Sequence, residues 1–115
     1  MDFEKETIND VVIEKINLSR ATYKEAGEFR KIIESDISGG CDKFIISLKL
    51  CEYIDSTFLG VFINTLKQIK KNGGDLKLAS ACDDIQVFLD ITKITQFIQI
   101  YPDTESALIS FNKNQ

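Results

Sequence analysis

The sequence predicts a single α/β domain in which about four helices pack on a small mixed, mostly parallel sheet of about five strands. Short strand-like apolar runs alternate with apolar stripes at helical spacing, which favours parallel strands joined by helical crossovers. The chain has 115 residues, 43% of them hydrophobic and 28% charged. This length suits one hydrophobic core rather than two, so we expect one domain over 1–115 with an ordered core of roughly 3–112.

A hairpin is expected to open the fold. Two short strand-like runs, 3–8 and 11–16, lie on either side of Asn9-Asp10. Both turn residues tolerate left-handed backbone, so the two runs are predicted to pair as antiparallel strands.

The first helix and the central strand follow. Thr22 and Glu25 form a capping box, after which apolar residues recur at helical spacing until Gly39-Gly40. The nearly continuous apolar run 44–48 is then typical of a strand that is covered on both faces.

The second helix is predicted over 56–71. One apolar stripe runs along it, lysines lie in its last turns where the helix dipole favours cations, and Asn72-Gly73-Gly74 ends it. We interpret both glycine pairs as helix stops rather than phosphate-binding loops, because neither opens a helix after a strand and no Gly-Lys-Ser/Thr follows.

The last third of the chain continues the alternation. Residues 76–79 alternate like a strand, and Ser80 with Asp83 is expected to cap a third helix. Residues 97–101 are interpreted as a last strand that ends at Pro102. Asp103 is expected to cap a terminal helix, and the chain is expected to fray after Asn112.

Charge and composition exclude several classes of function. The net charge is −4 and the 14 basic residues are scattered, which argues against a nucleic-acid partner. No apolar run approaches the roughly 18 residues needed to cross a bilayer, and the acidic start MDFEKE lacks the pattern of a secretory signal. We therefore expect a cytoplasmic protein without direct membrane insertion.

Cysteine and histidine usage argues against an enzyme. Cys41, Cys51 and Cys82 are widely spaced, and the chain contains no histidine. Common zinc sets and histidine-centred acid-base chemistry are therefore excluded, and the cysteines are interpreted as reduced thiols. We expect no catalytic residue, no cofactor and no metal.

The segment 53–60 carries the functional hypothesis. It is predicted to run from a buried strand directly into a helix start, where a hydroxyl is exposed and surrounded by unpaired backbone N–H groups. A phosphate attached there would gain about 0.3 to 1 kcal/mol from the dipole, and up to roughly 2 in good geometry. Ser56 is therefore a candidate phosphoacceptor, with Thr57 as the second choice.

Three segments carry a family resemblance. Asp55-Ser56-Thr57-x-Leu59-Gly60-Val61 resembles the Asp-Ser-[Ser/Thr]-Gly-Leu-Gly-Val signature of the STAS-domain anti-sigma factor antagonists. The helix end and next strand, from Leu66-Lys67 through Gly73-Gly74-x-Leu76-x-Leu78, and the segment Phe88-Leu89-Asp90-Ile91-Thr92 are also similar to that family.

The resemblance implies a partner switch in transcription regulation. In the family, the serine after the aspartate is phosphorylated by a serine kinase that is also the anti-sigma factor, and a serine phosphatase removes the phosphate. That serine corresponds to Ser56. The unmodified form would bind the anti-sigma factor, and the phosphorylated form would release it.

Several alternatives remain open at this point. Ser56 can be an unmodified helix cap, in which case the chain would be a STAS docking subunit of a transporter complex or a signalling scaffold. A third hypothesis is that the chain is a small enzyme or a ligand carrier. Asp55 can cap the helix or orient the partner's chemistry.

The sequence departs from the family pattern in two places. Phe58 replaces a glycine, and with Val61 it would either form an exposed apolar patch for a partner or pack over Phe62 at the core edge. The loop Ser19–Thr22 lacks the family's acidic residue, and Thr22 is interpreted mainly as a helix cap, although its position also makes it a candidate for partner binding.

Overall fold

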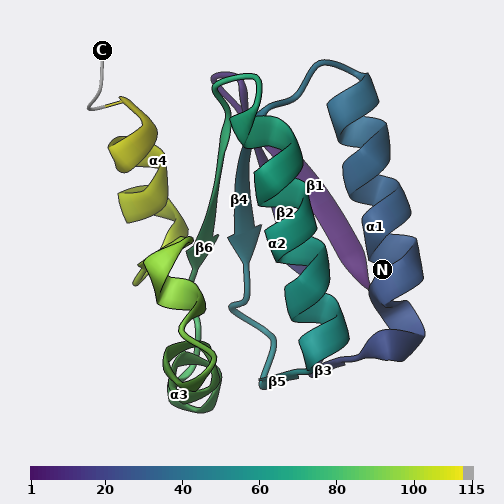
Figure 1. Cartoon of the computed structure of the whole chain (residues 1–115), viewed down its shortest axis with the longest axis vertical. Helices are drawn as coiled ribbons and strands as arrows, with labels where there is room; N and C mark the ends of the chain where they lie inside the picture. Colours follow the sequence, from purple (N-terminus) through teal and green to yellow (C-terminus); the bar gives the residue numbers. More distant parts are fainter. Residues whose placement is uncertain (113–115) are drawn as a thin grey trace.

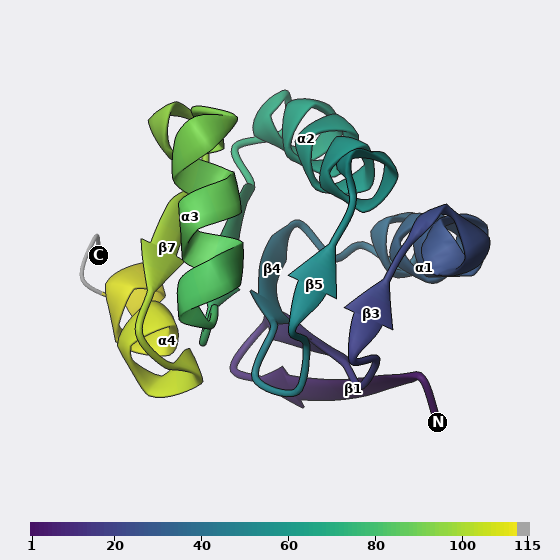
Figure 2. The same cartoon turned by 90° about the horizontal axis from the view of Figure 1, so that it is seen from below.

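One mixed sheet with helices on both faces forms the domain (Figures 1 and 2). The computed structural model describes residues 1–112. The elements are, in chain order, β1 (Phe3–Ile8), β2 (Val11–Ile16), β3 (Arg20–Ala21), α1 (Tyr23–Ser38), β4 (Lys43–Ser47), β5 (Tyr53–Ile54), α2 (Ser56–Lys70), β6 (Asp75–Ala79), α3 (Asp83–Ile91), the 3-10 helix η1 (Ile94–Gln96), β7 (Gln99–Tyr101) and α4 (Thr104–Asn112).

The five-stranded sheet has the order β1-β2-β4-β6-β7. β1 and β2 pair antiparallel across Asn9 and Asp10, both of which have positive φ, and every later pair in the sheet is parallel. The predicted hairpin, the mostly parallel sheet and the four α-helices are therefore confirmed.

The central strand β4 divides the apolar core in two. Phe44 and Ile46 point into the larger cluster with α1, α2 and α3, whereas Ile45 packs with Ala107 of α4 on the opposite face. All three side chains are fully buried. A continuous apolar run is required here because both faces of the strand are covered.

The helix ends predicted from glycines and capping residues are largely confirmed. Thr22 and Glu25 form the capping box of α1. After α2, Gly73 has a φ of +81°, and the Gly74 N–H donates to the carbonyl of Ile69 at 2.9 Å. A Cβ on Gly74 would lie 2.2 Å from the carbonyl oxygen of Asp42, so only glycine fits there.

Two details of the last third of the chain were predicted incorrectly. The N-cap of α3 is Cys82, which makes no side-chain capping bond, and Ser80 has a φ of +65°. The last strand begins only at Gln99, because η1 occupies the preceding residues and leaves Phe97 exposed. Apolar character alone does not distinguish these short elements. The predicted fraying after Asn112 concerns residues outside the described range.

Among residues 1–112, no helix combines the length and the apolar character needed to span a bilayer.

Candidate functional site

Ser56 is the first residue of α2, and its side chain is exposed, as is that of Thr57. Among residues 1–112, no hydrogen-bond partner is found for the backbone N–H of either residue, as expected in the first turn of a helix. The predicted hydroxyl at a helix start is therefore present.

The strand that precedes Ser56 is not the central strand of the sheet. β4 ends at Ser47, and the segment that reaches Ser56 passes through β5, which forms a separate two-stranded parallel sheet with β3. The expectation of a direct step from the buried core strand into the helix was wrong. Two-residue strands are too short to leave a periodic signal in the sequence.

The small β3–β5 sheet brings two helix starts together (Figure 2). Arg20 pairs with Tyr53 and Ala21 with Ile54, and the two apolar side chains of the second pair are buried. Directly after these strands the chain enters α1 on one side and α2 on the other. The amino ends of both helices therefore lie side by side at one end of the domain.

Asp55 connects the two helix starts. Its Oδ1 accepts a hydrogen bond from the N–H of Phe58 at 3.0 Å, which caps α2. Its Oδ2 accepts from the N–H of Tyr23 at 2.8 Å, and Tyr23 is the first residue of α1. The capping interpretation of Asp55 is confirmed, and the second cap was not predicted. A role for Asp55 toward a partner stays a prediction.

Thr22 is confirmed as the cap of α1. Its hydroxyl accepts from the N–H of Lys24 at 3.3 Å, and Glu25 Oε1 accepts from the N–H of Thr22 at 3.0 Å. The side chain is half-buried. Partner contact by Thr22 stays a prediction.

Of the two interpretations left open for Phe58 and Val61, the exposed apolar patch is wrong, because both side chains are buried. The Phe58 ring lies 5.2 Å from that of Phe29 in α1 and 6.1 Å from that of Phe62, centroid to centroid. α2 packs against α1 as well as the sheet, so it buries a wider face than one stripe. Packing on Phe62, the alternative reading, is confirmed.

The sequence analysis did not identify two side chains of the small β3–β5 sheet that precedes Ser56. The Arg20 guanidinium lies 4.2 Å from the centroid of the Tyr53 ring, and both residues are exposed. A cation stacked on an aromatic face is a common contact surface. Arg20 and Tyr53 meet because of the β3–β5 register, which the sequence alone does not reveal.

The cysteines are three free thiols, as expected. Burial raises the pKa of the Cys51 thiol, which lies on the segment leading to β5. A thiol with a raised pKa is a poor nucleophile. It therefore contributes packing rather than chemistry to this end of the domain.

Comparison with known proteins fixes the family. The model of the STAS domain matches residues 2–107. The chain belongs to the STAS-domain family. The STAS-domain chain is 41% identical over 63 residues to the anti-sigma-B factor antagonist of Bacillus subtilis, which is 55% of this chain and 58% of that protein. The match thus spans less than two thirds of this relative.

Two further comparisons extend over nearly the whole STAS domain. A Thermotoga maritima protein, provisionally named an anti-sigma factor antagonist, is 30% identical over 107 residues, covering 92% of this chain and 94% of that one. A crystal structure of a Thermotoga maritima protein with the same provisional name has a TM-score of 0.88 at 27% identity, covering 96% of this chain and 95% of that chain. The predicted resemblance is therefore confirmed for both sequence and fold.

Proposed function

We propose that this STAS domain is an anti-sigma factor antagonist that acts as a phosphorylation-controlled partner switch in the cytoplasm. Unmodified, it binds an anti-sigma factor that is also a serine kinase. Phosphorylation of Ser56 releases that partner, and a serine phosphatase restores binding. The domain itself is non-catalytic in this scheme.

The observation that carries the proposal is the exposed hydroxyl of Ser56 at the first position of α2. A kinase can reach this hydroxyl without unfolding the domain. The free backbone N–H groups of the first helical turn and the helix dipole would stabilise the added phosphate. These features would allow the domain to carry the phosphate without a change of fold.

Release follows from electrostatics. A phosphoryl group adds about −1.5 to −2 charges and three acceptor oxygens. It would sit beside the Asp55 carboxylate, in a chain whose net charge is already −4. A thousandfold loss of affinity requires only about 4 kcal/mol, which one unmatched dianion in an interface can supply.

Incubation with a serine kinase of histidine-kinase fold from the same organism, plus ATP, tests the proposal. Intact-mass spectrometry should show the mass of one phosphate on the wild type and on Thr57→Ala, and none on Ser56→Ala. Ser56→Asp should weaken partner binding about tenfold or more. If the wild type stays unmodified with every such kinase, or if Ser56→Ala is still modified, the proposal fails.

The docking-subunit alternative has lost part of its support. It drew on the two departures from the family pattern, Phe58 and the loop Ser19–Thr22, and the Phe58 side chain is buried rather than presented to a partner. The relatives from Bacillus subtilis and Thermotoga maritima are named for anti-sigma factor antagonism. The partner switch is therefore the function that we propose.

A further inference from the structure

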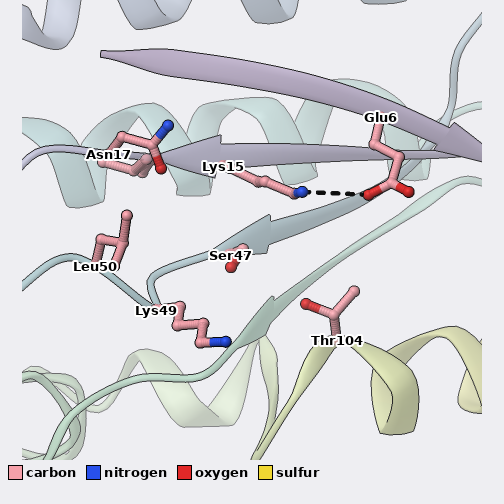
Figure 3. A pocket seen from close by; sticks show the side chains of 8 residues that line it. Glu6, Lys15, Asn17, Ser47, Lys49, Leu50 and Thr104 are labelled. Carbon is pink, nitrogen blue, oxygen red and sulfur yellow. Dashed lines mark ion pairs between the residues drawn. The ribbon is translucent and has the colours of Figure 1, made fainter. Parts of the chain in front are cut away.

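A pocket of about 370 Å³ lies on the face of the sheet that α4 covers, opposite α1 and α2. It opens where β2 and β4 end, next to the first residue of α4 (Figure 3). Its volume is within the range of small-molecule sites. The residues that line it are Glu6, Lys15, Ile16, Asn17, Ser47, Lys49, Leu50 and Thr104.

Three polar side chains without partners converge in this pocket. Ser47 is only 6% exposed, yet its hydroxyl has no hydrogen-bond partner among residues 1–112. Within the same range, Lys49 Nζ and the Thr104 hydroxyl are also unpaired. Figure 3 shows the Ser47 hydroxyl, the Lys49 ammonium and the Thr104 hydroxyl pointing toward the same space. The Ser47 hydroxyl faces the pocket, where a ligand or water can reach it.

One of the two lysines that line this pocket has no ion-pair partner among residues 1–112. Lys15 pairs with Glu6 at 3.3 Å, so these two charges offset each other, while Lys49 makes no ion pair in that range. Thr104 begins the nine-residue helix α4, and the Asp103 and Glu105 carboxylates on either side of it offset the positive potential of the helix dipole. The neighbouring Asp103 carboxylate is occupied with the N–H and hydroxyl of Ser106. The ammonium of Lys49 and the hydroxyls of Ser47 and Thr104 can together bind a tetrahedral oxyanion.

We propose that this pocket binds a small phosphorylated polyol, such as a sugar phosphate. The phosphate would be held by the side chains of Ser47, Lys49 and Thr104. The Asn17 amide oxygen and the Lys15–Glu6 pair offer hydrogen bonds to sugar hydroxyls, while the Asn17 amide nitrogen already donates to the Met1 carbonyl and to Glu4 Oε1. Among the described residues, the lining contains no aromatic side chain on which a nucleobase could stack, which disfavours a nucleotide.

The pocket is connected to the segment that carries Ser56. Lys49 and Leu50 belong to the stretch that joins β4 to β5, and β5 leads through Asp55 into α2. A ligand held by Lys49 therefore contacts the chain six residues before Asp55, on the other face of the sheet. The binding itself does not depend on the proposed partner switch.

Titration of the full chain with glycerol 3-phosphate, followed by amide chemical shifts, tests the pocket. We expect saturable shifts at residues around Ser47, Lys49 and Thr104, and no saturation with glycerol. Lys49→Gln should weaken binding at least tenfold. The matched control Lys31→Gln removes an exposed lysine on α1 and should leave binding unchanged.

Ser47→Ala is a second variant that distinguishes the loss of a ligand contact from a loss of folding. It removes only the hydroxyl, and it should weaken binding severalfold while the unfolding midpoint stays close to that of the wild type. Equal affinity of the wild type and Lys49→Gln would overturn the proposal, as would tighter binding of adenosine monophosphate than of glycerol 3-phosphate. Neither result bears on the phosphorylation of Ser56.

Discussion

Asp55 accepts a hydrogen bond from the amino end of each of two helices, and its removal should therefore cost more than that of an ordinary cap. The two acceptor contacts are 3.0 Å to the N–H of Phe58 and 2.8 Å to the N–H of Tyr23. In Asp55→Ala both N–H groups lose their acceptor. The second contact ties together residues that are 32 positions apart in sequence.

The magnitude follows from the cost of losing a cap. Replacing a capping Asp by Ala costs about 0.5 to 2 kcal/mol per helix. With two helix ends affected, Asp55→Ala should lower the free energy of unfolding by about 2 kcal/mol, in the middle of the doubled range. In a domain of this size that corresponds to a fall of roughly 8 °C in the melting temperature. Asp55→Asn keeps one acceptor oxygen and should cost about half as much.

A double-mutant cycle isolates the bond between the helices. Tyr23→Pro removes the N–H at the first helical position, where proline is tolerated, and the extended backbone of Thr22 (φ −127°, ψ −177°) is compatible with a following proline. Tyr23→Ala controls for loss of the ring. We expect a coupling energy of about 1 kcal/mol between Asp55→Ala and Tyr23→Pro in urea unfolding.

Simple additivity of the effects of Asp55→Ala and Tyr23→Pro would refute this expectation. In that case the contact between Asp55 and α1 would not contribute to stability. A melting temperature of Asp55→Ala within about 2 °C of the wild type would likewise show that neither cap matters.

Three further predictions concern the core and the turns. Phe58→Ala should lower the free energy of unfolding by about 3 to 5 kcal/mol in urea, since its ring is fully buried; a loss below about 1 kcal/mol would contradict the packing. Burial raises the pKa of Glu14 to about 9, from an ordinary value of 4.5. The unfolded chain releases this proton first, so stability is full below pH 4.5 and is lost as the pH rises toward 9. Between pH 5 and pH 8, Glu14→Gln should reduce this loss in the free energy of unfolding by about 1 kcal/mol or more, measured by urea unfolding at each pH. An unchanged dependence of that free energy on pH would contradict the prediction. Gly74→Ala should destabilise the domain by about 1 to 3 kcal/mol, because its Cβ would collide with Asp42. Gly60→Ala, which has free space around it in α2, should instead stabilise the domain by about 0.5 to 1 kcal/mol. Equal melting temperatures of the two variants would refute this contrast.

The succession of helices and strands is readable from the sequence because each signal is local. The capping box at Thr22, the glycine stop after α2 and the apolar run of β4 each involve residues within a few positions of one another. The family motif likewise lies within one short segment, so the helix start at Ser56 is predictable from the sequence alone.

Contacts between distant segments were decided only by the tertiary structure. The β3–β5 ladder joins Arg20 to Tyr53, and the second acceptor contact of Asp55 crosses from one helix to another. Phe58 faces a buried aromatic cluster rather than a partner, because α1 covers the side of α2 that a single helical wheel leaves open. Such contacts leave no periodic trace in the sequence, since each depends on where the sheet brings two separate segments together.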